Sequence, residues 1–136
     1  MVSACIQMLA KAGLTISIAE SASAGKLAYE FSLTPSAGQV LKEGVVCYDA
    51  GVQVRVLGVP QYVIDEHTPE SADVTRILAV RLRDLLESDV GVGITWLLAP
   101  GGARRTKNRS ERSFSAYPQR TVLWRCRWSS AAARPR

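Results

Sequence analysis

The sequence has few of the residues from which metal sites and disulfide frameworks are built. Its 136 residues include one histidine, His67, and three widely separated cysteines, Cys5, Cys47 and Cys126, with no Cys-x-x-Cys pair. A lone histidine and unpaired cysteines do not supply the ligands of a structural zinc site, and they do not form a disulfide framework. We therefore expect reduced cysteines, no bound metal and a cytoplasmic protein.

Long apolar runs are also missing. No uncharged apolar segment approaches the roughly 20 residues that a membrane-spanning helix needs, so we expect no membrane partner. Hydrophobic residues still make up 47% of the chain and charged residues 21%, which is typical of a globular domain.

Acidic residues are almost missing from the last quarter of the chain. Residues 1–102 hold seven basic and eleven acidic residues, a net charge of −4, whereas residues 103–136 hold ten basic residues and one acid, Glu111, a net charge of +9. We therefore divide the chain into a domain at 1–102 and a basic tail at 103–136. The tail shows no hydrophobic periodicity, so we predict that it is disordered. A nucleic-acid arm is the alternative, and we rank it last among the functions considered.

Hydrophobic periodicity divides the first 102 residues into alternating helices and strands. Helices are expected at 2–12, from Ser21 and at 68–85, and strands at 15–19, 44–48 and 90–95. Ser21 and Thr68 are both suitable N-cap residues for the helices that they begin. The stretch 49–59 stays open, because its valines alternate as in a strand while Asp49 suits a helix start. This order predicts a three-layer α/β/α fold with a mostly parallel sheet.

Three stretches at the ends of predicted strands contain residues that can carry chemistry. Ser21 follows the first strand, and a serine at a helix N-terminus lies among free backbone N–H groups that suit an oxyanion or a phosphate. Tyr48 follows the second strand and can assist proton transfer. Pro100-Gly101-Gly102 follows the third and can cradle an anion. The ordinary interpretations are a helix cap, a packed tyrosine and a turn.

Taken together over residues 9–102, these stretches resemble the C-terminal domain family of the CinA proteins. The segment from Ala19 to Gly25 is similar to the family's Ala-Glu-Ser-Cys-Thr-Gly-Gly. The other matching positions are Gly44-Val45-Val46-Cys47-Tyr48, Val54-Arg55-Val56-Leu57-Gly58-Val59-Pro60, His67, Ser71, Val74, Gly93-Ile94-Thr95 and Pro100-Gly101-Gly102. The ordered set at compatible spacings identifies the resemblance. It also implies a helix over 49–57.

The resemblance implies a reaction, because stand-alone members of this family are nicotinamide-nucleotide amidohydrolases. They convert nicotinamide mononucleotide into the acid and ammonia through an acyl-enzyme on serine. The catalytic residues that it implies are Ser21, the nucleophile, and Tyr48. The implied substrate-binding residues are Glu20, Ser23, Gly25, Thr95, Gly101 and Gly102. The implied partner is a small nucleotide, with no cofactor, no metal and a homo-oligomer as one assembly.

The chain departs from the family pattern at positions that matter for this reaction. Gln53 stands where the family has the lysine that looks like the general base, and a base of this kind contributes roughly 10²–10⁴-fold to the rate. Trp96 replaces a glycine in the ligand loop, and Ala24 replaces a glycine where a positive φ would strain an alanine. The alternative function is therefore a non-catalytic nucleotide-binding protein.

The family's C-terminal segment is not found in the tail. Joining the last base of each codon to the first two bases of the next, from Thr106, allows codons for residues 106–113 to read Glu-Lys-Pro-Val-Gly-Thr-Val. This is the order that the family shows after its Pro-Gly-Gly. We hypothesise that a frameshift between Gly101 and Thr106 replaced the natural C-terminus, so that the domain lacks its last strand and helix.

Sequencing the coding DNA tests the frameshift. The third bases of these codons can vary without changing the protein, so the protein sequence alone does not decide the question. If the frame has shifted, the codons for residues 106–113 give that heptapeptide in the alternative frame. Any other peptide in that frame would contradict the hypothesis.

Overall fold

The sheet has four strands in the order β2-β1-β3-β4. The structure is a computed structural model that describes residues 2–96 and the backbone of residues 120–126. Strands β1 (Ile16–Glu20), β2 (Leu41–Val46) and β3 (Val90–Trp96) run parallel, with Glu20 in register with both Val46 and Ile94. All three strands therefore end at the same edge of the sheet.

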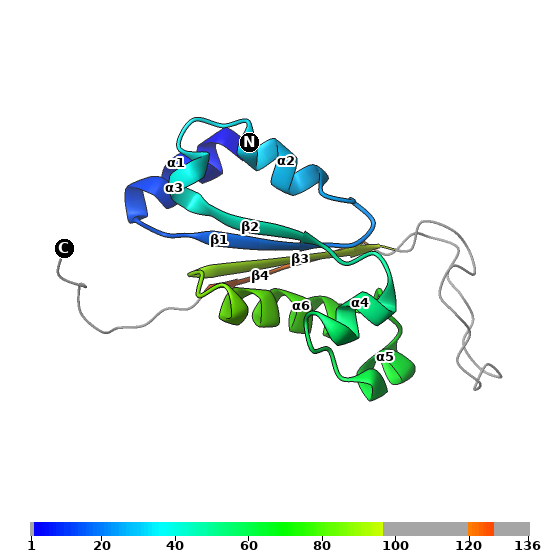
Figure 1. Ribbon diagram of the computed structural model, residues 1–136. Helices are drawn as coiled ribbons and strands as arrows, with labels where there is room; N and C mark the ends of the chain where they lie inside the picture. The colour runs from blue at the N-terminus through cyan, green and yellow to red at the C-terminus, as the bar shows by residue number, and fades with distance from the viewer. Residues whose placement is uncertain (1, 97–119, 127–136) are drawn as a thin grey trace.

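Helices cover both faces of this sheet, as Figure 1 shows. One face carries α1 (Val2–Ala12), α2 (Lys26–Ser32) and α3 (Ala37–Val40), and the other carries α4 (Ala50–Arg55), α5 (Gln61–His67) and α6 (Ala72–Leu85). The predicted three-layer α/β/α fold with a mostly parallel sheet is confirmed. None of the described helices is long and apolar enough to cross a membrane.

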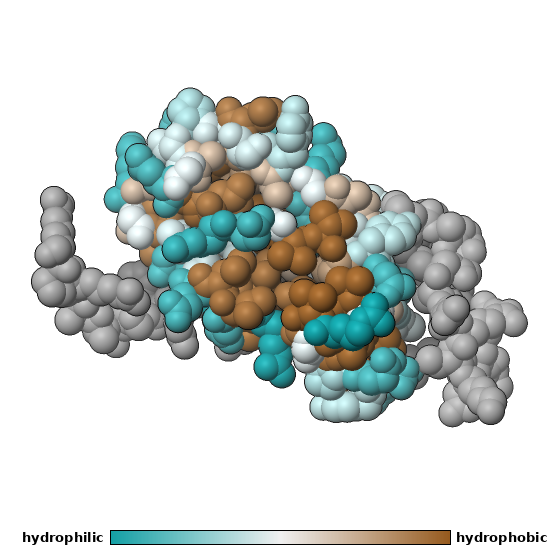
Figure 2. All heavy atoms as spheres, viewed as in Figure 1, coloured by the Kyte–Doolittle hydropathy of each residue, from teal (hydrophilic) through white to brown (hydrophobic). Residues whose placement is uncertain are grey.

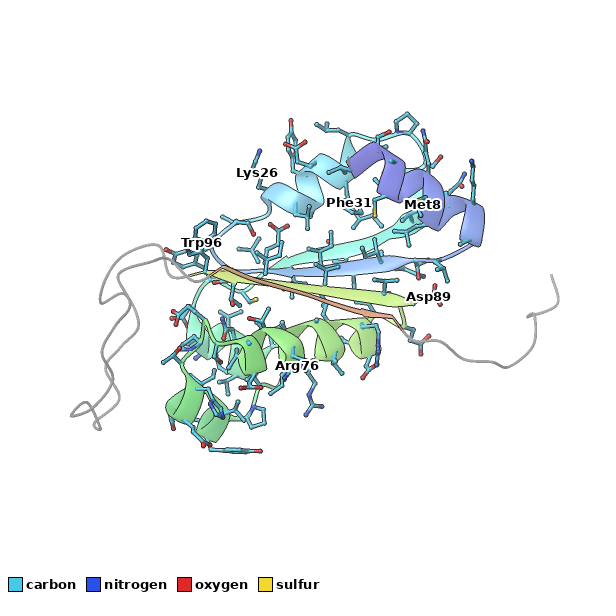
Figure 3. The ribbon with its side chains drawn as sticks, turned by 180° about the vertical axis from the view of Figure 1, so that it is seen from behind. Met8, Lys26, Phe31, Arg76, Asp89 and Trp96 are labelled. Carbon is cyan, nitrogen blue, oxygen red and sulfur yellow. The ribbon has the colours of Figure 1, made fainter. Side chains whose placement is uncertain are left out.

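Strand β1 is buried on both faces because it lies between β2 and β3, in the part of the sheet that helices cover on both sides. Ile16 and Ile18 pack into a cluster with α1–α3, where Phe31 lies between α2 and the sheet (Figure 3), and Ala19 packs into a second cluster with α6. Hydrophobic residues also reach the surface at the edge strand and along α4 (Figure 2), and Val46 at the end of β2 is about half exposed.

Helix α6 packs unusually close to β3, because this strand offers glycine on the face that the helix covers. A Cβ atom on Gly91 would overlap the carbonyl oxygen of Ala79, and a Cβ atom on Gly93 would overlap that of Thr75. The alternation of valine and glycine in β3 therefore places small residues under α6 and larger ones against α1 and α2.

The structure adds a strand that the sequence analysis did not expect. Strand β4 (Arg120–Cys126) pairs antiparallel with β3, between Val90↔Cys126 and Trp96↔Arg120. Its sequence, Arg-Thr-Val-Leu-Trp-Arg-Cys, contains the β-branched and aromatic residues that strands favour. The rest of the tail, residues 103–119 and 127–136, lies outside the described residues. The expected loss of the family's last helix concerns this part of the chain.

Two predicted helix starts are wrong. Helix α2 begins at Lys26 with Gly25 as its N-cap, so Ser21 does not cap it. Helix α6 begins at Ala72, and its N-cap is Ser71, whose hydroxyl accepts a hydrogen bond from the Val74 N–H at 3.2 Å. Thr68 instead ends α5, a helix that the sequence analysis missed between the turn at Pro60 and Thr68.

The close packing of α6 on β3 predicts that Gly93→Ala lowers the free energy of unfolding by about 1–3 kcal/mol, because the new methyl group meets rigid helix backbone. Urea unfolding followed by circular dichroism measures this change. Gly38→Ala is the matched control, since a Cβ atom at Gly38 in α3 has no neighbour within 4 Å. Equal stability of the two variants would contradict the close approach.

Candidate active site at the carboxyl edge of the sheet

The residues singled out in the sequence gather where the three parallel strands end. Ser21 directly follows β1, and its N–H donates a hydrogen bond to the Ile94 carbonyl of β3 at 2.9 Å. Cys47 directly follows β2, and its N–H donates to the carbonyl oxygen of Glu20 at 2.7 Å. In parallel α/β sheets, ligands bind outside this edge. The structure therefore brings the ends of all three strands together at the place where a site is expected.

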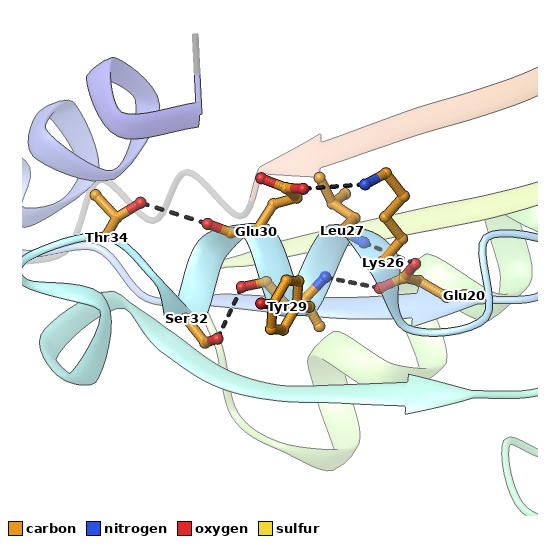
Figure 4. Close-up of polar contacts among 8 residues, drawn as sticks. Glu20, Lys26, Leu27, Tyr29, Glu30, Ser32 and Thr34 are labelled. Atoms are coloured by element: carbon orange, nitrogen blue, oxygen red, sulfur yellow. Dashed lines mark hydrogen bonds and ion pairs between the residues drawn. The ribbon is translucent and has the colours of Figure 1, made fainter.

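Glu20 is the last residue of β1, and its side chain is fully buried. Its carboxylate accepts two backbone hydrogen bonds from the first turn of α2, Oε1 from the Ala28 N–H at 2.8 Å and Oε2 from the Leu27 N–H at 3.0 Å (Figure 4). The N-cap residue Gly25 makes no side-chain cap bond. Glu20 thus satisfies N–H groups that have no partner within the helix, and its charge lies at the positive end of the dipole.

This contact changes the expected role of Ser21. The sequence predicts that Ser21 lies among free N–H groups at a helix N-terminus, but the Leu27 and Ala28 N–H groups of α2 are bonded to Glu20. The Ser21 residue is only 6% exposed. Within the described part of the chain its hydroxyl forms no hydrogen bond, so no general base contacts it there. An anion at Ser21 would therefore need other donors.

The turn between Ser21 and α2 is tight. The Ala24 N–H donates to the Ser21 carbonyl at 3.0 Å, and the Lys26 N–H donates to the Ser23 carbonyl at 3.0 Å. Ala24 has a φ of 51° and Gly25 a φ of 91°. The sequence indicates strain at Ala24 if its φ is positive, and the structure has that geometry, which favours glycine. Among the described residues, the buried hydroxyl of Ser23 has no hydrogen-bond partner.

The second strand end carries Tyr48, which is 64% exposed rather than packed in the core. Asp49 next to it caps α4, because its carboxylate accepts a hydrogen bond from the Gly51 N–H at 2.9 Å. The implied helix over 49–57 is confirmed for 50–55. Tyr48 is therefore at the expected edge and largely exposed, and within residues 2–96 no hydrogen bond fixes its hydroxyl.

Gln53 of α4 is buried beneath the end of β2, with 1% of its surface exposed. Its side-chain Nε2 donates to the Cys47 carbonyl oxygen at 3.3 Å, whereas its Oε1 has no hydrogen-bond partner among the described residues. A buried polar atom without a partner costs about 1–3 kcal/mol. An amide does not take up a serine proton near neutral pH, so Gln53 cannot act as a general base.

Cys47 is the other reactive residue type at this edge. Burial raises the pKa of its thiol to about 11, its own backbone hydrogen bond lowers it, and the charge of Glu20 adds to the increase. The Sγ donates weakly to the Glu20 carbonyl oxygen at 3.4 Å. Since the thiolate is the nucleophilic form, Cys47 is unreactive at neutral pH, and hydroxyl groups are the nucleophile candidates at the ends of β1 and β2.

Thr95 on β3 is fully buried, and its hydroxyl points toward α6 rather than toward α2. It donates to the Glu70 carbonyl oxygen at 3.0 Å and lies 2.5 Å from the Thr75 hydroxyl, which can itself donate to the Ser71 carbonyl oxygen at 2.7 Å. The hydroxyl groups of Thr75 and Thr95 have one proton each, so two protons are shared among the three contacts. Thr95 therefore fixes the start of α6 against β3.

The remaining predicted site residues lie further along the chain. Trp96 ends β3 at the same end of the sheet as Lys26, whereas Asp89 lies at the opposite end (Figure 3). Gly101 and Gly102 lie outside the described residues. Across the part of the chain that the structure describes, no group of three histidine, cysteine or acidic side chains could hold a metal ion.

From the sequence, Glu20 is expected only to bind substrate, and Gln53 is notable only because it stands where the family has a lysine. The structure shows both side chains buried at the strand ends. Both carboxylate oxygens of Glu20 accept hydrogen bonds, whereas the Nε2 of Gln53 donates one and its Oε1 has no partner among the described residues. A signal for Glu20 was present, because a carboxylate directly after Ile-Ser-Ile-Ala in a buried strand requires hydrogen-bond donors nearby.

Comparison with known proteins agrees with this architecture. The family described as the CinA C-terminal domain matches residues 1–113. A relative from Desulforudis audaxviator, named as competence-damage inducible, is 37% identical over 100 residues, which are 74% of this chain and 24% of that protein. A CinA-like protein from Synechococcus sp. (strain CC9902) is 34% identical over 97 residues, 71% of this chain and 23% of the relative. The chain thus spans about a quarter of the length of these relatives.

Solved structures show the same fold. A CinA superfamily protein from Escherichia coli superimposes with a TM-score of 0.73 at 21% identity, covering 90% of this chain and 73% of that one. A competence/damage inducible protein from Agrobacterium tumefaciens gives 0.71 at 23% identity, covering 74% and 61%. The family match, the sequence relatives and the fold agree, and the chain belongs to the CinA C-terminal domain family.

Proposed function

We propose that the carboxyl edge of this sheet is an amidohydrolase site for the carboxamide of nicotinamide mononucleotide, with Ser21 as the nucleophile. The observation that carries the proposal is the position of Ser21 at the shared end of β1, β2 and β3, in a tight turn that exposes a little of its surface. The family resemblance supplies the substrate. The proposal includes a cytoplasmic protein, a nucleotide as the small-molecule partner and a homo-oligomer.

The reaction has two steps. The Ser21 oxygen attacks the amide carbonyl carbon, the C–N bond breaks, and the amide nitrogen leaves as ammonia with the serine proton. Water then cleaves the acyl ester, which releases the acid and restores the hydroxyl. Gln53 cannot carry the serine proton to the leaving nitrogen, so in this chain water or the Tyr48 hydroxyl relays it, accepting the serine proton as it gives its own proton to the nitrogen. We therefore expect slow turnover.

The buried amide of Gln53 favours a second candidate function, a nucleotide-binding protein without catalysis. The side chain at this position is held by the Cys47 carbonyl oxygen and carries no titratable nitrogen. The base that the family resemblance implies is therefore missing from the proposed site. Hydrolysis and binding are separable by experiment.

Ammonia release from nicotinamide mononucleotide tests the first function. We expect slow release by the unchanged chain, loss of release in Ser21→Ala, and an increase of roughly 10²–10⁴-fold in Gln53→Lys, which supplies the missing base. Ser32→Ala is the matched control, because Ser32 is exposed on α2 and its hydroxyl donates to the Tyr29 carbonyl oxygen of the same helix.

Each outcome selects one function. Release that survives Ser21→Ala would reject Ser21 as the nucleophile. No release from any variant, combined with binding of the nucleotide by calorimetry, would establish the non-catalytic function. Circular dichroism of Gln53→Lys checks that the buried lysine has not unfolded the domain, since burial disfavours its charged form.

A further inference from the structure

We propose that the indole ring of Trp96 determines which nucleotides bind, because it stacks against a cationic pyridinium ring at the carboxyl edge of the sheet. The inference rests on the proposed nucleotide site and deepens it by naming the residue that contacts the ring of the ligand. It also assigns a role to a tryptophan that stands where the family resemblance has a glycine.

The alternation of side chains along β3 places Trp96 on the face of the sheet that α2 covers. Val92 and Ile94 pack into the cluster with α1–α3, whereas Gly93 and Thr95 face α6. Since successive side chains of a strand point to opposite faces, Trp96 follows Ile94 onto the α2 side. Figure 3 shows the ring on this side of β3.

This position is next to the turn that carries the candidate nucleophile. The Ser21 N–H donates to the Ile94 carbonyl oxygen at 2.9 Å, and Trp96 follows Ile94 by two residues on the same strand. Ser21 and Trp96 thus belong to the neighbouring ends of β1 and β3. A nicotinamide ring whose carboxamide lies at Ser21 can therefore lie against the indole.

The indole offers carbon surface rather than a polar group to such a ligand. Trp96 is partly exposed, whereas its Nε1 is buried. Any exposed part of the side chain is therefore ring carbon. The face of an indole packs against flat rings and attracts cations, because its π-electrons carry partial negative charge.

The ring of nicotinamide mononucleotide suits this surface. It is flat and aromatic, and its nitrogen carries a permanent positive charge because it is bonded to the ribose. Lys26 lies at the same end of the sheet (Figure 3), but its ammonium group is exposed and pairs with Glu30 at 3.0 Å. Solvent and this ion pair screen its repulsion of a cation.

A neutral ligand of the same shape isolates the contribution of the charge. In benzamide riboside 5′-monophosphate a carbon atom replaces the ring nitrogen, whereas the carboxamide, the ribose and the phosphate are unchanged. Both ligands fill the same space and offer the same hydrogen bonds. Only the pyridinium ring gains the attraction between a cation and the indole face. The ratio of the two affinities therefore measures this attraction.

Isothermal titration of the Ser21→Ala chain with both nucleotides tests the inference without consuming ligand. We expect the pyridinium nucleotide to bind about tenfold tighter than the benzamide nucleotide, as a cation on the face of a tryptophan would give. Adding Trp96→Leu should bring the ratio close to one, and Trp96→Phe should keep part of it. Adding Tyr62→Leu, which removes an exposed aromatic ring of α5 in the opposite helix layer, should leave the ratio unchanged.

Absorption spectroscopy supplies a second measurement. An indole stacked on a pyridinium ring gives a charge-transfer band at longer wavelengths than either ring alone. We expect this band when nicotinamide mononucleotide binds the Ser21→Ala chain, and we expect its loss in Trp96→Phe and with the benzamide nucleotide. A tryptophan that only supports the fold would give no such band.

The outcomes distinguish this inference from the proposed function. Equal affinity for the two nucleotides, or a ratio that Trp96→Leu leaves unchanged, would overturn it. Tighter binding of both nucleotides by Trp96→Gly would also overturn it, because the indole would then block the site. Binding of neither nucleotide would overturn it together with the nucleotide site. A ratio that depends on Trp96 in a chain that releases no ammonia would support the inference and reject hydrolysis. If Trp96→Leu does not fold, Trp96→Phe and the absorption band decide.

Discussion

The carboxylate of Glu20 is the contact on which the candidate site depends. One side chain accepts both the Leu27 and the Ala28 N–H of α2, while the carbonyl of the same residue accepts the N–H of Cys47. It therefore connects the ends of β1 and β2 to the start of a helix on the neighbouring layer. A buried carboxylate is stable only when such donors satisfy it, so the helix and the strand end depend on each other.

This arrangement limits the chemistry that the edge of the sheet can perform. The first turn of α2 is occupied by a negative side chain, so it does not offer those amides to a phosphate or an oxyanion. Cys47 stays protonated because burial raises the pKa of its thiol to about 11. Ser21 supplies the hydroxyl, and Gln53 supplies a fixed amide in place of a base. The described part of this edge therefore presents a serine hydroxyl with no general base in contact with it.

The sequence predicted the three layers and the mostly parallel sheet better than the boundaries of the elements or their buried polar contacts. Helical spacing located α1 correctly because this signal is local, whereas the helix that follows Asp49 was decided by the family resemblance. Ser21 failed as a cap because the true partner of the α2 N–H groups is Glu20, seven and eight residues away from them. Gly93 gave no sequence signal, since the backbone that it admits comes from α6. Contacts of this kind are set by packing between layers.

Amide hydrogen exchange in Glu20→Gln tests the central contact most directly. A glutamine has one acceptor oxygen, so it can satisfy only one of the Leu27 and Ala28 N–H groups and presents its NH₂ group to the other. We predict that both amides are protected in the unchanged chain and in Glu30→Gln, a matched variant on the exposed face of α2, and that at least one exchanges much faster in Glu20→Gln. Unchanged protection of both amides in Glu20→Gln would contradict the account.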